Sequence, residues 1–475
     1  MGSRDKKTKS KGQIAVELLF LSAVVVALIT GFVSLAASLL QISVRNQNKL
    51  QAFSIAEAGI EYYRWHLAHA PTDFTDGTGG SGPYLHDYFD KNGVKIGQFS
   101  LSIASPPNGS TIVTITSAGS VVADSSVKKV IKVRMGIPSF AKYAVAANDF
   151  MRFGSGTEVY GEIFSNQGVH FDGVAHNLVS SALTTTTDPD TGKLQWAIFT
   201  TVSPADPQPP TPYSARPTIF MAGRALGSPR IDFTAITQNL ANLKASAQSG
   251  GYYATSSGAF GYDLSLASSG IFSLYKVTAL TSPSWSCTNA AGQSGWGSWS
   301  IRTETLVATG TFPANGIFFA EDNLWVRGQI NGARLTIASG KFPDNPSTRT
   351  SITLNTNLLY TNYDGTDSIG LISQNNINVG MVSDNTFRVD AALVAQNGRV
   401  GRYYYGSGCA PYNIRNTITS YGMIATNQRY GFAYTDGTGY QTRNLIYDAN
   451  LLYGPPPSFP LTTDSYSLIS WQEVQ

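Results

Sequence analysis

A run of 27 residues without a charged side chain, from Leu18 to Val44, constrains this chain more than any other feature. As a helix this run would be about 40 Å long, which exceeds the ~30 Å hydrocarbon core of a bilayer. It is also longer than the apolar stretch of about 7–15 residues in a cleavable secretory signal. Five basic side chains precede it within residues 1–12, which favours a cytoplasmic N-terminus and a body outside. The sequence predicts one membrane-spanning segment at residues 18–44; cleavage near the small residues at 34–37 is an open alternative.

Two details at the start of this run indicate more than a plain anchor. Gly12 and Gln13 stand immediately before it, and Glu17 is the fifth residue after Gly12. An acidic side chain at the edge of a membrane helix is costly and implies a partner. This arrangement resembles the type IV prepilin signal. The resemblance implies that a prepilin peptidase removes residues 1–12, that the new amine of Gln13 is methylated, and that Glu17 pairs with that amine in a neighbouring subunit. A generic signal anchor is the alternative.

The helix is expected to continue beyond the membrane. Apolar side chains recur at intervals of three and four residues and predict one buried stripe: Leu50, Phe53, Ala56, Ile60, Tyr63 and Leu67. The stretch 52–61, Ala-Phe-Ser-Ile-Ala-Glu-Ala-Gly-Ile-Glu, resembles the "AEAGLE" segment of minor pilins of the PilX N-terminal type. The resemblance covers about residues 9–67 and implies a pilin helix over 13–70, which Pro71 ends.

Residues 71–137 are expected to form a small antiparallel β unit on this helix. Apolar and polar residues alternate in 99–103 and 128–135, and 111–117 is a third candidate strand. A helix packed on such strands makes this part of the chain α+β in class.

Residues 138–475 repeat a loose pattern of two apolar residues, a small residue, an amide or acidic corner, another apolar pair and usually a glycine. It occurs at 144–154, 163–173, 318–328, 371–380, 393–401 and 423–431. Short strands that turn at Asn and Gly predict a parallel β-helix-like, all-β surface domain. A β-sandwich or several small sheets is the alternative. An irregular insertion is expected at about 175–310, with a helix near 231–247, and a Tyr-rich cap at 401–475.

The candidate catalytic and metal-binding residues are better explained as turn residues. Four acids in the repeat region, at 364, 367, 384 and 390, are the best catalytic candidates, but 364–365 and 384–385 are turn sequences, so a polysaccharide-degrading β-helix enzyme is the less favoured reading. His170 and His176 lack a matching ligand cluster, and the acids at 188 and 190 lack most of a calcium-loop pattern. We therefore expect no enzyme, no metal and no cofactor. Because the chain after residue 12 has a net charge close to zero, no nucleic-acid partner is expected either.

Two cysteines and three tryptophans are the remaining candidate residues of region 138–475. Cys287 and Cys409 either form one disulfide in an oxidising compartment or remain separate thiols. Trp285, Trp296 and Trp299 lie among Gly and Ser, where aromatic side chains contact sugars or proteins. The alternative for these tryptophans is that they anchor the insertion to the coil.

Together these features predict a membrane-anchored minor or tip subunit of a type IV pilus-like filament, involved in pilus assembly and surface adhesion. Its expected partners are other pilin subunits, a prepilin peptidase and the pilus assembly machinery. The expected location is the bacterial inner membrane, with one pass and the body outside, and then the cell surface. A standalone membrane-anchored adhesin is the alternative function.

Overall fold

The computed structural model describes residues 11–107, 109–297, 300–461 and 465–474, which divide into two compact units. The helix–sheet unit consists of Met1–Ser105, Val113–Gly136 and Ser465–Gln475, and the coil unit of Pro106–Ile112 and Ile137–Asp464. The class is α+β: a long helix with a small antiparallel sheet, and a large all-β body of parallel strands, as the sequence predicts.

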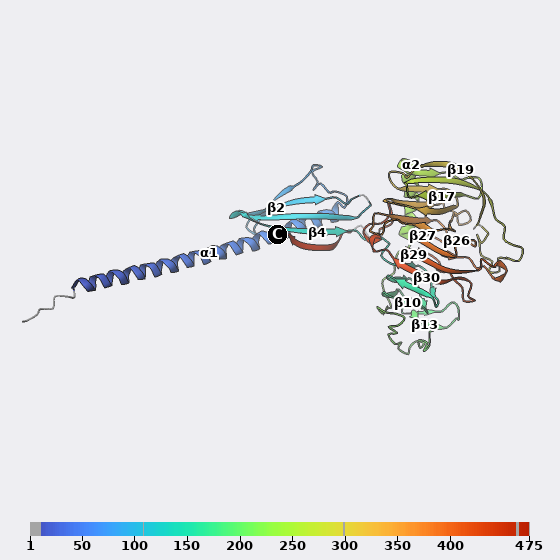
Figure 1. Ribbon diagram of the computed structural model, residues 1–475, viewed down its shortest axis with the longest axis horizontal. Helices are drawn as coiled ribbons and strands as arrows, with labels where there is room; N and C mark the ends of the chain where they lie inside the picture. Colours follow the sequence, from blue (N-terminus) through green and yellow to red (C-terminus); the bar gives the residue numbers. More distant parts are fainter. Residues whose placement is uncertain (1–10, 108, 298–299, 462–464, 475) are drawn as a thin grey trace, which may run out of the picture. The chain divides into compact units, whose positions relative to one another are not determined.

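The helix–sheet unit is built on α1, Lys11–His69, a single helix of 59 residues (Figure 1). Its last part buries a stripe of six side chains against the sheet: Ala52, Ile55, Ala56, Ile60, Tyr63 and Leu67. The predicted stripe is right from Phe53 onward, where Phe53 is partly buried against the same cluster, and wrong at Leu50, which is 71% exposed. The apolar contacts with the sheet begin at Ala52, so Leu50 lies before the buried stripe.

The sheet of this unit has five strands in the order β1-β2-β3-β4-β31, all antiparallel. Three of them match the strands that alternation predicts: β2 (Lys95–Ala104), β3 (Ile112–Val121) and β4 (Asp124–Gly136). The other two are β1 (Tyr84–Phe89) and β31 (Ser467–Val474). The final strand of the chain therefore completes a sheet whose other strands lie before residue 137.

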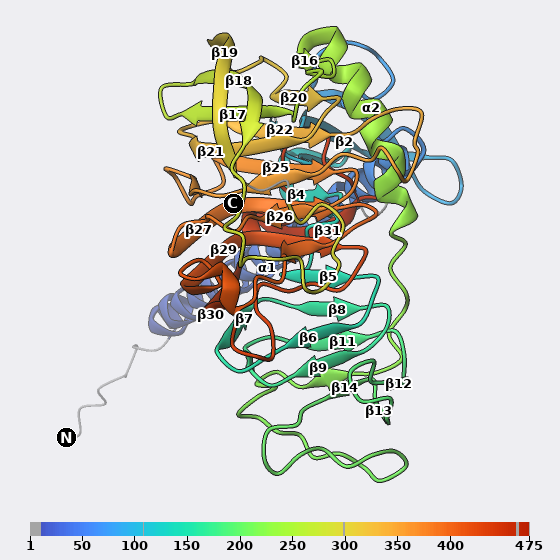
Figure 2. The ribbon, with the colours of Figure 1, turned by 90° about the vertical axis from the view of Figure 1, so that its right-hand side faces the viewer.

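The coil unit is a stack of parallel strands. One column runs through the whole stack (Figure 2). From one end to the other it consists of β16 (Tyr252–Ala254), β20 (Ile317–Ala320), β22 (Arg334–Ser339), β25 (Ser368–Ser373), β27 (Thr386–Ala395), β29 (Ile414–Thr426), β5 (Val145–Ala147), β8 (Ile163–Ser165), β11 (Val179–Ser181) and β15 (Arg224–Ala225).

The chain enters this column in the middle of the stack. It builds coils outward from β5 to β15, crosses to the far end as helix α2 (Thr234–Gly250), and builds coils back from β16 until β29 pairs with β5. The first and last coils are consequently neighbours. Figure 2 shows α2 beside the upper part of the column. Its Leu240, Leu243 and Ala247 share one buried cluster with side chains from the outer face of the column.

Further columns complete each coil. A second column is made by β17 (Tyr262–Ala267), β21 (Leu324–Gln329), β23 (Ile352–Leu354), β26 (Ile377–Val379) and β28 (Val400–Arg402). On another side, β30 (Gly439–Tyr447) pairs with β29 and with β7 (Thr157–Tyr160), which pairs with β10 (Val174–Ala175). A separate sheet holds β6 (Met151–Phe153), β9 (Val169–Phe171) and β14 (Ile198–Phe199). A hairpin, β18 (Ile271–Leu280) and β19 (Ile301–Thr311), extends the second column beyond β17.

The core of the coil unit includes a row of aliphatic and aromatic side chains on successive strands of the first column. Eight of them are buried and lie in register on adjacent strands: Phe318, Ile337, Leu371, Leu393, Ile424, Val145, Ile163 and Val179. Stacked coils with one continuous interior confirm the β-helix-like architecture.

Two expected segments of this body differ in the structure. Residues 401–475 do not form a cap: β29 and β30 are interior coils, and β31 belongs to the helix–sheet unit. The expected insertion at 175–310 is regular in part, because β10, β11 and β15 extend the stack by parallel pairing. These strands are only two or three residues long, and the irregular loop before β15 is rich in proline. The repeat pattern therefore cannot be recognised in this part of the sequence.

Candidate functional site

The exposed apolar part of α1 is the first candidate for a functional surface. Every residue from 14 to 44 is exposed, including large side chains such as Leu19, Phe20 and Phe32. By length and composition this helix could cross a membrane, and none of its most apolar window is buried. Contiguous apolar surface on this scale marks an interaction with a membrane or with protein.

Three hydroxyl groups in this part of α1 donate hydrogen bonds to the helix backbone. The hydroxyl of Ser22 donates to the carbonyl of Leu19 at 2.9 Å, and that of Thr30 donates to Val26 at 2.7 Å. Ser38 donates to Ser34 at 2.9 Å. In a medium without water, each unpaired polar group costs several kcal/mol. These bonds make the segment suited to an apolar environment.

Glu17 lies on α1 at the start of this apolar surface. Its side chain is exposed and forms no salt bridge within the described part of the chain. Gly12 and Gln13 lie in the first turn of α1. The rest of the expected leader, residues 1–10, falls outside the described residues. The backbone of α1 therefore carries all three residues on one continuous helix with the apolar run.

The stretch that resembles the pilin "AEAGLE" segment has a packing role. A Cβ atom on Gly59 would lie 2.3 Å from Ser117 Oγ and 2.9 Å from a ring carbon of Phe99. On the facing strand, a Cβ on Gly119 would lie 2.1 Å from the carbonyl oxygen of Ala52. Small residues on both surfaces let the helix approach the sheet closely. The structure accounts for Gly59 by packing, without a ligand or a reaction.

The candidate surface residues of the repeat region separate in the structure. Cys287 and Cys409 are joined by a disulfide. Trp296 is buried and its indole N–H donates to the carbonyl of Tyr404 at 2.9 Å, so it anchors its loop as the alternative reading holds. Trp285 is 95% exposed and is available for contact. Trp299 lies outside the described residues.

The four acids that could have marked a hydrolase form local bonds instead of one catalytic group. Asp364 accepts from the amide and hydroxyl of Thr366, and Asp384 accepts from the amide of Asn357. Asp367 is buried and accepts from three backbone amides, and Asp390 is bound by Arg388 at 2.7 Å. These bonds are typical of structural turns.

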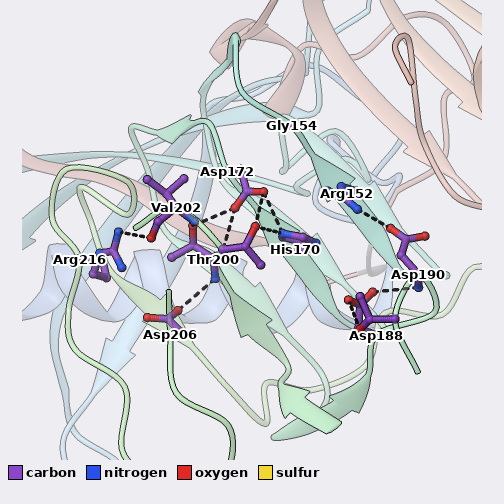
Figure 3. Close-up of polar contacts among 12 residues, drawn as sticks. Arg152, Gly154, His170, Asp172, Asp188, Asp190, Thr200, Val202, Asp206 and Arg216 are labelled. Atoms are coloured by element: carbon purple, nitrogen blue, oxygen red, sulfur yellow. Dashed lines mark hydrogen bonds and ion pairs between the residues drawn. The ribbon is translucent and has the colours of Figure 1, made fainter. Parts of the chain in front are cut away.

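The two histidines that could have formed a metal site are separately engaged. His170 Nε2 lies 2.9 Å from Asp172 Oδ2 (Figure 3). The His170 ring also stacks on that of Phe199. Burial opposes ionisation of Asp172, but hydrogen bonds from His170 and Thr201 outweigh it and lower the pKa of that carboxyl. His176 stacks on Tyr160 instead.

A second grouping around His170 is no better suited to a cation. One ligand atom each from His170, Asp188 and Asp190 lies within 4.8 Å of the others. Both oxygens of Asp190, however, are bound by Arg429 at 2.7 and 2.8 Å, and one of them also by Arg152 at 2.8 Å. A cation would have to displace two guanidinium groups, so this cluster is better described as a structural ion-pair network.

Comparison with known proteins adds little to these observations. No protein-family model and no curated protein sequence matches this chain. The crystal structure of the competence-associated pilin ComZ from Thermus thermophilus is similar over 90% of this chain and 98% of that chain, at 13% identity and a TM-score of 0.31. A TM-score this low does not establish a common fold.

Proposed function

We propose that this chain is a membrane-anchored subunit of a type IV pilus-like filament. The observation that supports the proposal best is the division of α1. Residues 14–44 are exposed and apolar, whereas six side chains between Ala52 and Leu67 pack on a small antiparallel sheet. A plain anchor needs no such continuous helix, and it has no use for Glu17 at the edge of the apolar run.

In this proposal a prepilin peptidase cuts after Gly12 and the new amine of Gln13 is methylated. The Glu17 carboxylate then pairs with the amine of a neighbouring subunit as the assembly machinery draws the helix from the inner membrane. The coil unit, which holds most of the residues, is exposed at the cell surface. A body of this size in every copy would crowd a thin shaft, which favours a minor or tip subunit with a role in adhesion.

The processing step is tested by co-expression with a prepilin peptidase. The chain should become 12 residues shorter and begin at Gln13, as read by N-terminal mass spectrometry. A Gly12→Leu variant should insert in the membrane but remain uncut. Cleavage near residue 37, or no cleavage of the unmodified chain, would contradict the proposal.

The assembly step is tested at Glu17. An unpaired acid at the centre of a membrane helix costs about 2.5–3.5 kcal/mol, and less near the interface, so pairing with a neighbour's amine would be favourable. Glu17→Ala should insert and fold normally yet be missing from sheared surface filaments. Glu57→Ala, an exposed acid on the same helix, is the matched control and should assemble. If Glu17→Ala subunits enter filaments at wild-type levels, a standalone anchored adhesin becomes the better proposal.

A further inference from the structure

The coil unit contains a cleft with a volume of about 540 Å³ on the outer side of its second column. Its floor includes Asp263, Trp325 and Thr353, which are register neighbours on β17, β21 and β23. The next residue of each strand, Leu264, Val326 and Leu354 in turn, packs into the core, so the floor residues face outward. Neighbouring strands are about 4.8 Å apart, and the floor therefore presents one side chain per coil at that spacing.

The walls of the cleft come from two distant parts of the chain that a disulfide connects. Ser300, immediately before β19, and Arg302 and Glu304 within it line the cleft, as does Tyr412. The loop before β19 is joined by Cys287 to Cys409, close to Tyr412. The disulfide therefore keeps these two segments together in the absence of a ligand.

Three buried polar atoms of the cleft residues have no hydrogen-bond partner among the described residues: Trp325 Nε1, Ser300 Oγ and Glu304 Oε2. Trp325 is 3% exposed and Ser300 5%. A buried indole N–H normally finds an acceptor, because leaving it unpaired is unfavourable. A ligand that pairs with these three atoms must both donate and accept hydrogen bonds, and the cleft side chains must shift to admit it, because each atom has almost no accessible surface.

The charged side chains that line the cleft have no net charge. Arg327 Nε lies 2.8 Å from Asp263 Oδ2, Arg327 Nη2 lies 3.5 Å from Glu304 Oε1, and Arg302 is exposed at the rim. Two carboxyl and two guanidinium groups leave no excess charge. An anion would meet the carboxylates and a cation would meet the guanidinium groups. Hydroxyl groups, which both donate and accept, can bond to all four.

We propose that this cleft binds a neutral oligosaccharide, with Trp325, Glu304 and Arg327 bonding its hydroxyl groups. The volume lies within the range of known ligand sites. The spacing of the floor residues is close to the length of one pyranose unit, so successive sugars can meet successive coils. Binding at this cleft is independent of filament assembly, because it uses residues of the coil unit alone.

The proposal is tested with the full chain in a polyoxyethylene detergent, since detergents with sugar headgroups would compete. The probes are an array of immobilised neutral oligosaccharides and an array of acidic ones, followed by calorimetric titration with the best binder. We expect saturable binding of a neutral oligosaccharide at one site per chain. Trp325→Phe, which removes only the N–H and part of the ring, and Glu304→Gln should each weaken it about tenfold or more.

Matched controls separate the cleft from the rest of the surface. Trp196→Phe and Glu321→Gln change the same residue types elsewhere, since Glu321 pairs with Lys244 and Trp196 donates to the carbonyl of Thr211. Both should leave the affinity within about twofold. Circular dichroism and thermal melting identify any variant that fails to fold. If Trp325→Phe does not fold, Glu304→Gln still tests binding, because Glu304 is partly exposed. The proposal is overturned if no neutral oligosaccharide binds, if acidic ones bind more tightly, or if both cleft variants bind like the unmodified chain.

Discussion

At the scale of single residues, the coil unit relies on buried arginines that bond to backbone carbonyls. Arg402 is fully buried and lies within bonding distance of no carboxylate among the described residues. It donates to the carbonyl of Tyr412 at 2.6 Å, to that of Met381 at 3.0 Å and to Ser383 Oγ at 2.8 Å. Burial lowers the pKa of this guanidinium to about 10. The protonated group therefore remains charged at neutral pH.

Replacing Arg402 should destabilise the protein strongly. Arg402→Met leaves several buried acceptors unpaired, so the free energy of unfolding should fall by about 2–4 kcal/mol. Arg402→Lys keeps the charge but presents fewer donors, so its free energy of unfolding should lie between those of Arg402→Met and the unmodified chain. Arg230→Met, an exposed arginine in the same unit, should change stability by less than about 0.5 kcal/mol. Chemical denaturation of the full chain in detergent measures all three. If Arg402→Met has the same free energy of unfolding as the unmodified chain, these hydrogen bonds make no net contribution to stability.

A second prediction at this scale concerns Asp263 and pH. Burial raises the pKa of this carboxyl to about 6, although Arg327 opposes the rise and Glu304 adds to it. Because the folded chain holds this proton more tightly than the unfolded chain, the contribution of Asp263 to stability is present at pH 4 and is lost as pH rises to about 6. This loss is on the order of 2–3 kcal/mol. Asp263→Asn should remove that part of the pH dependence, as followed by denaturation from pH 4 to 8. If the free energy of unfolding depends on pH equally in Asp263→Asn and in the unmodified chain, the prediction is contradicted.

Few of these residues could be recognised from the sequence. Glu17 was identified because a lone acid stands out beside an apolar run. Asp263 and Trp325 were not, because they are distant in sequence and become neighbours only through the register of β17 with β21. Trp296 and Trp285 looked equivalent, yet one is buried and the other exposed. Burial of an aromatic side chain in a loop depends on tertiary contacts that local composition does not encode.

At the scale of elements, periodicity predicted α1 and three strands of its sheet. It missed β31, since this strand pairs with β4 across more than 300 residues and its alternation is weak. It also misplaced the start of the buried stripe, because the position at which the sheet begins to cover the helix is a tertiary property. The role of Gly59 follows from that same contact.

Gly59 provides the test at this scale. Helix propensity alone predicts that Gly59→Ala would stabilise the helix by about 1 kcal/mol. The structure predicts the opposite: the added methyl group would meet Ser117 and Phe99, and relieving the overlap should cost about 1–3 kcal/mol. Gly31→Ala is the control on the same helix, where nothing lies within 4 Å of the added atom. Thermal unfolding followed by circular dichroism compares the two. If Gly59→Ala melts above the unmodified chain, the close packing of α1 on the sheet is wrong.

At the scale of the whole molecule, the repeat pattern predicted coils but not their order. Each rung has a similar sequence, so the local pattern does not say which rung is its neighbour. The order is set where the first and last coils meet, along the pairing of β29 with β5 and of β30 with β7. Arg443 crosses this junction and donates to Thr157 Oγ1 at 2.9 Å. Such contacts between distant residues could not be inferred from one sequence.

A row of asparagine amides crosses the same junction and carries the last prediction. Asn148 Nδ2 donates to Asn427 Oδ1 at 2.9 Å, and Asn166 Nδ2 donates to Asn148 Oδ1 at 2.8 Å. Asn427 belongs to the returning coils and the other two to the outgoing coils, so the row joins the two halves of the stack. Asn148→Ala removes one hydrogen bond from each neighbour, although Asn166 keeps its bonds with Ile231 and Asn427 its bond to Asn397, and should cost about 1–3 kcal/mol.

A double-mutant cycle decides whether this row couples the two halves. If Asn148 and Asn427 bond across the junction, the combined variant should lose less stability than the sum of the single variants, by about 0.5–2 kcal/mol. Asn148 with Asn345, an exposed turn residue, should show additive losses. Hydrogen exchange gives an independent readout: weakening the junction should raise exchange in β5 and β29 before it does so in β22 and β25. Additive losses for Asn148 and Asn427 would mean that the backbone pairing alone holds the outgoing and returning coils together.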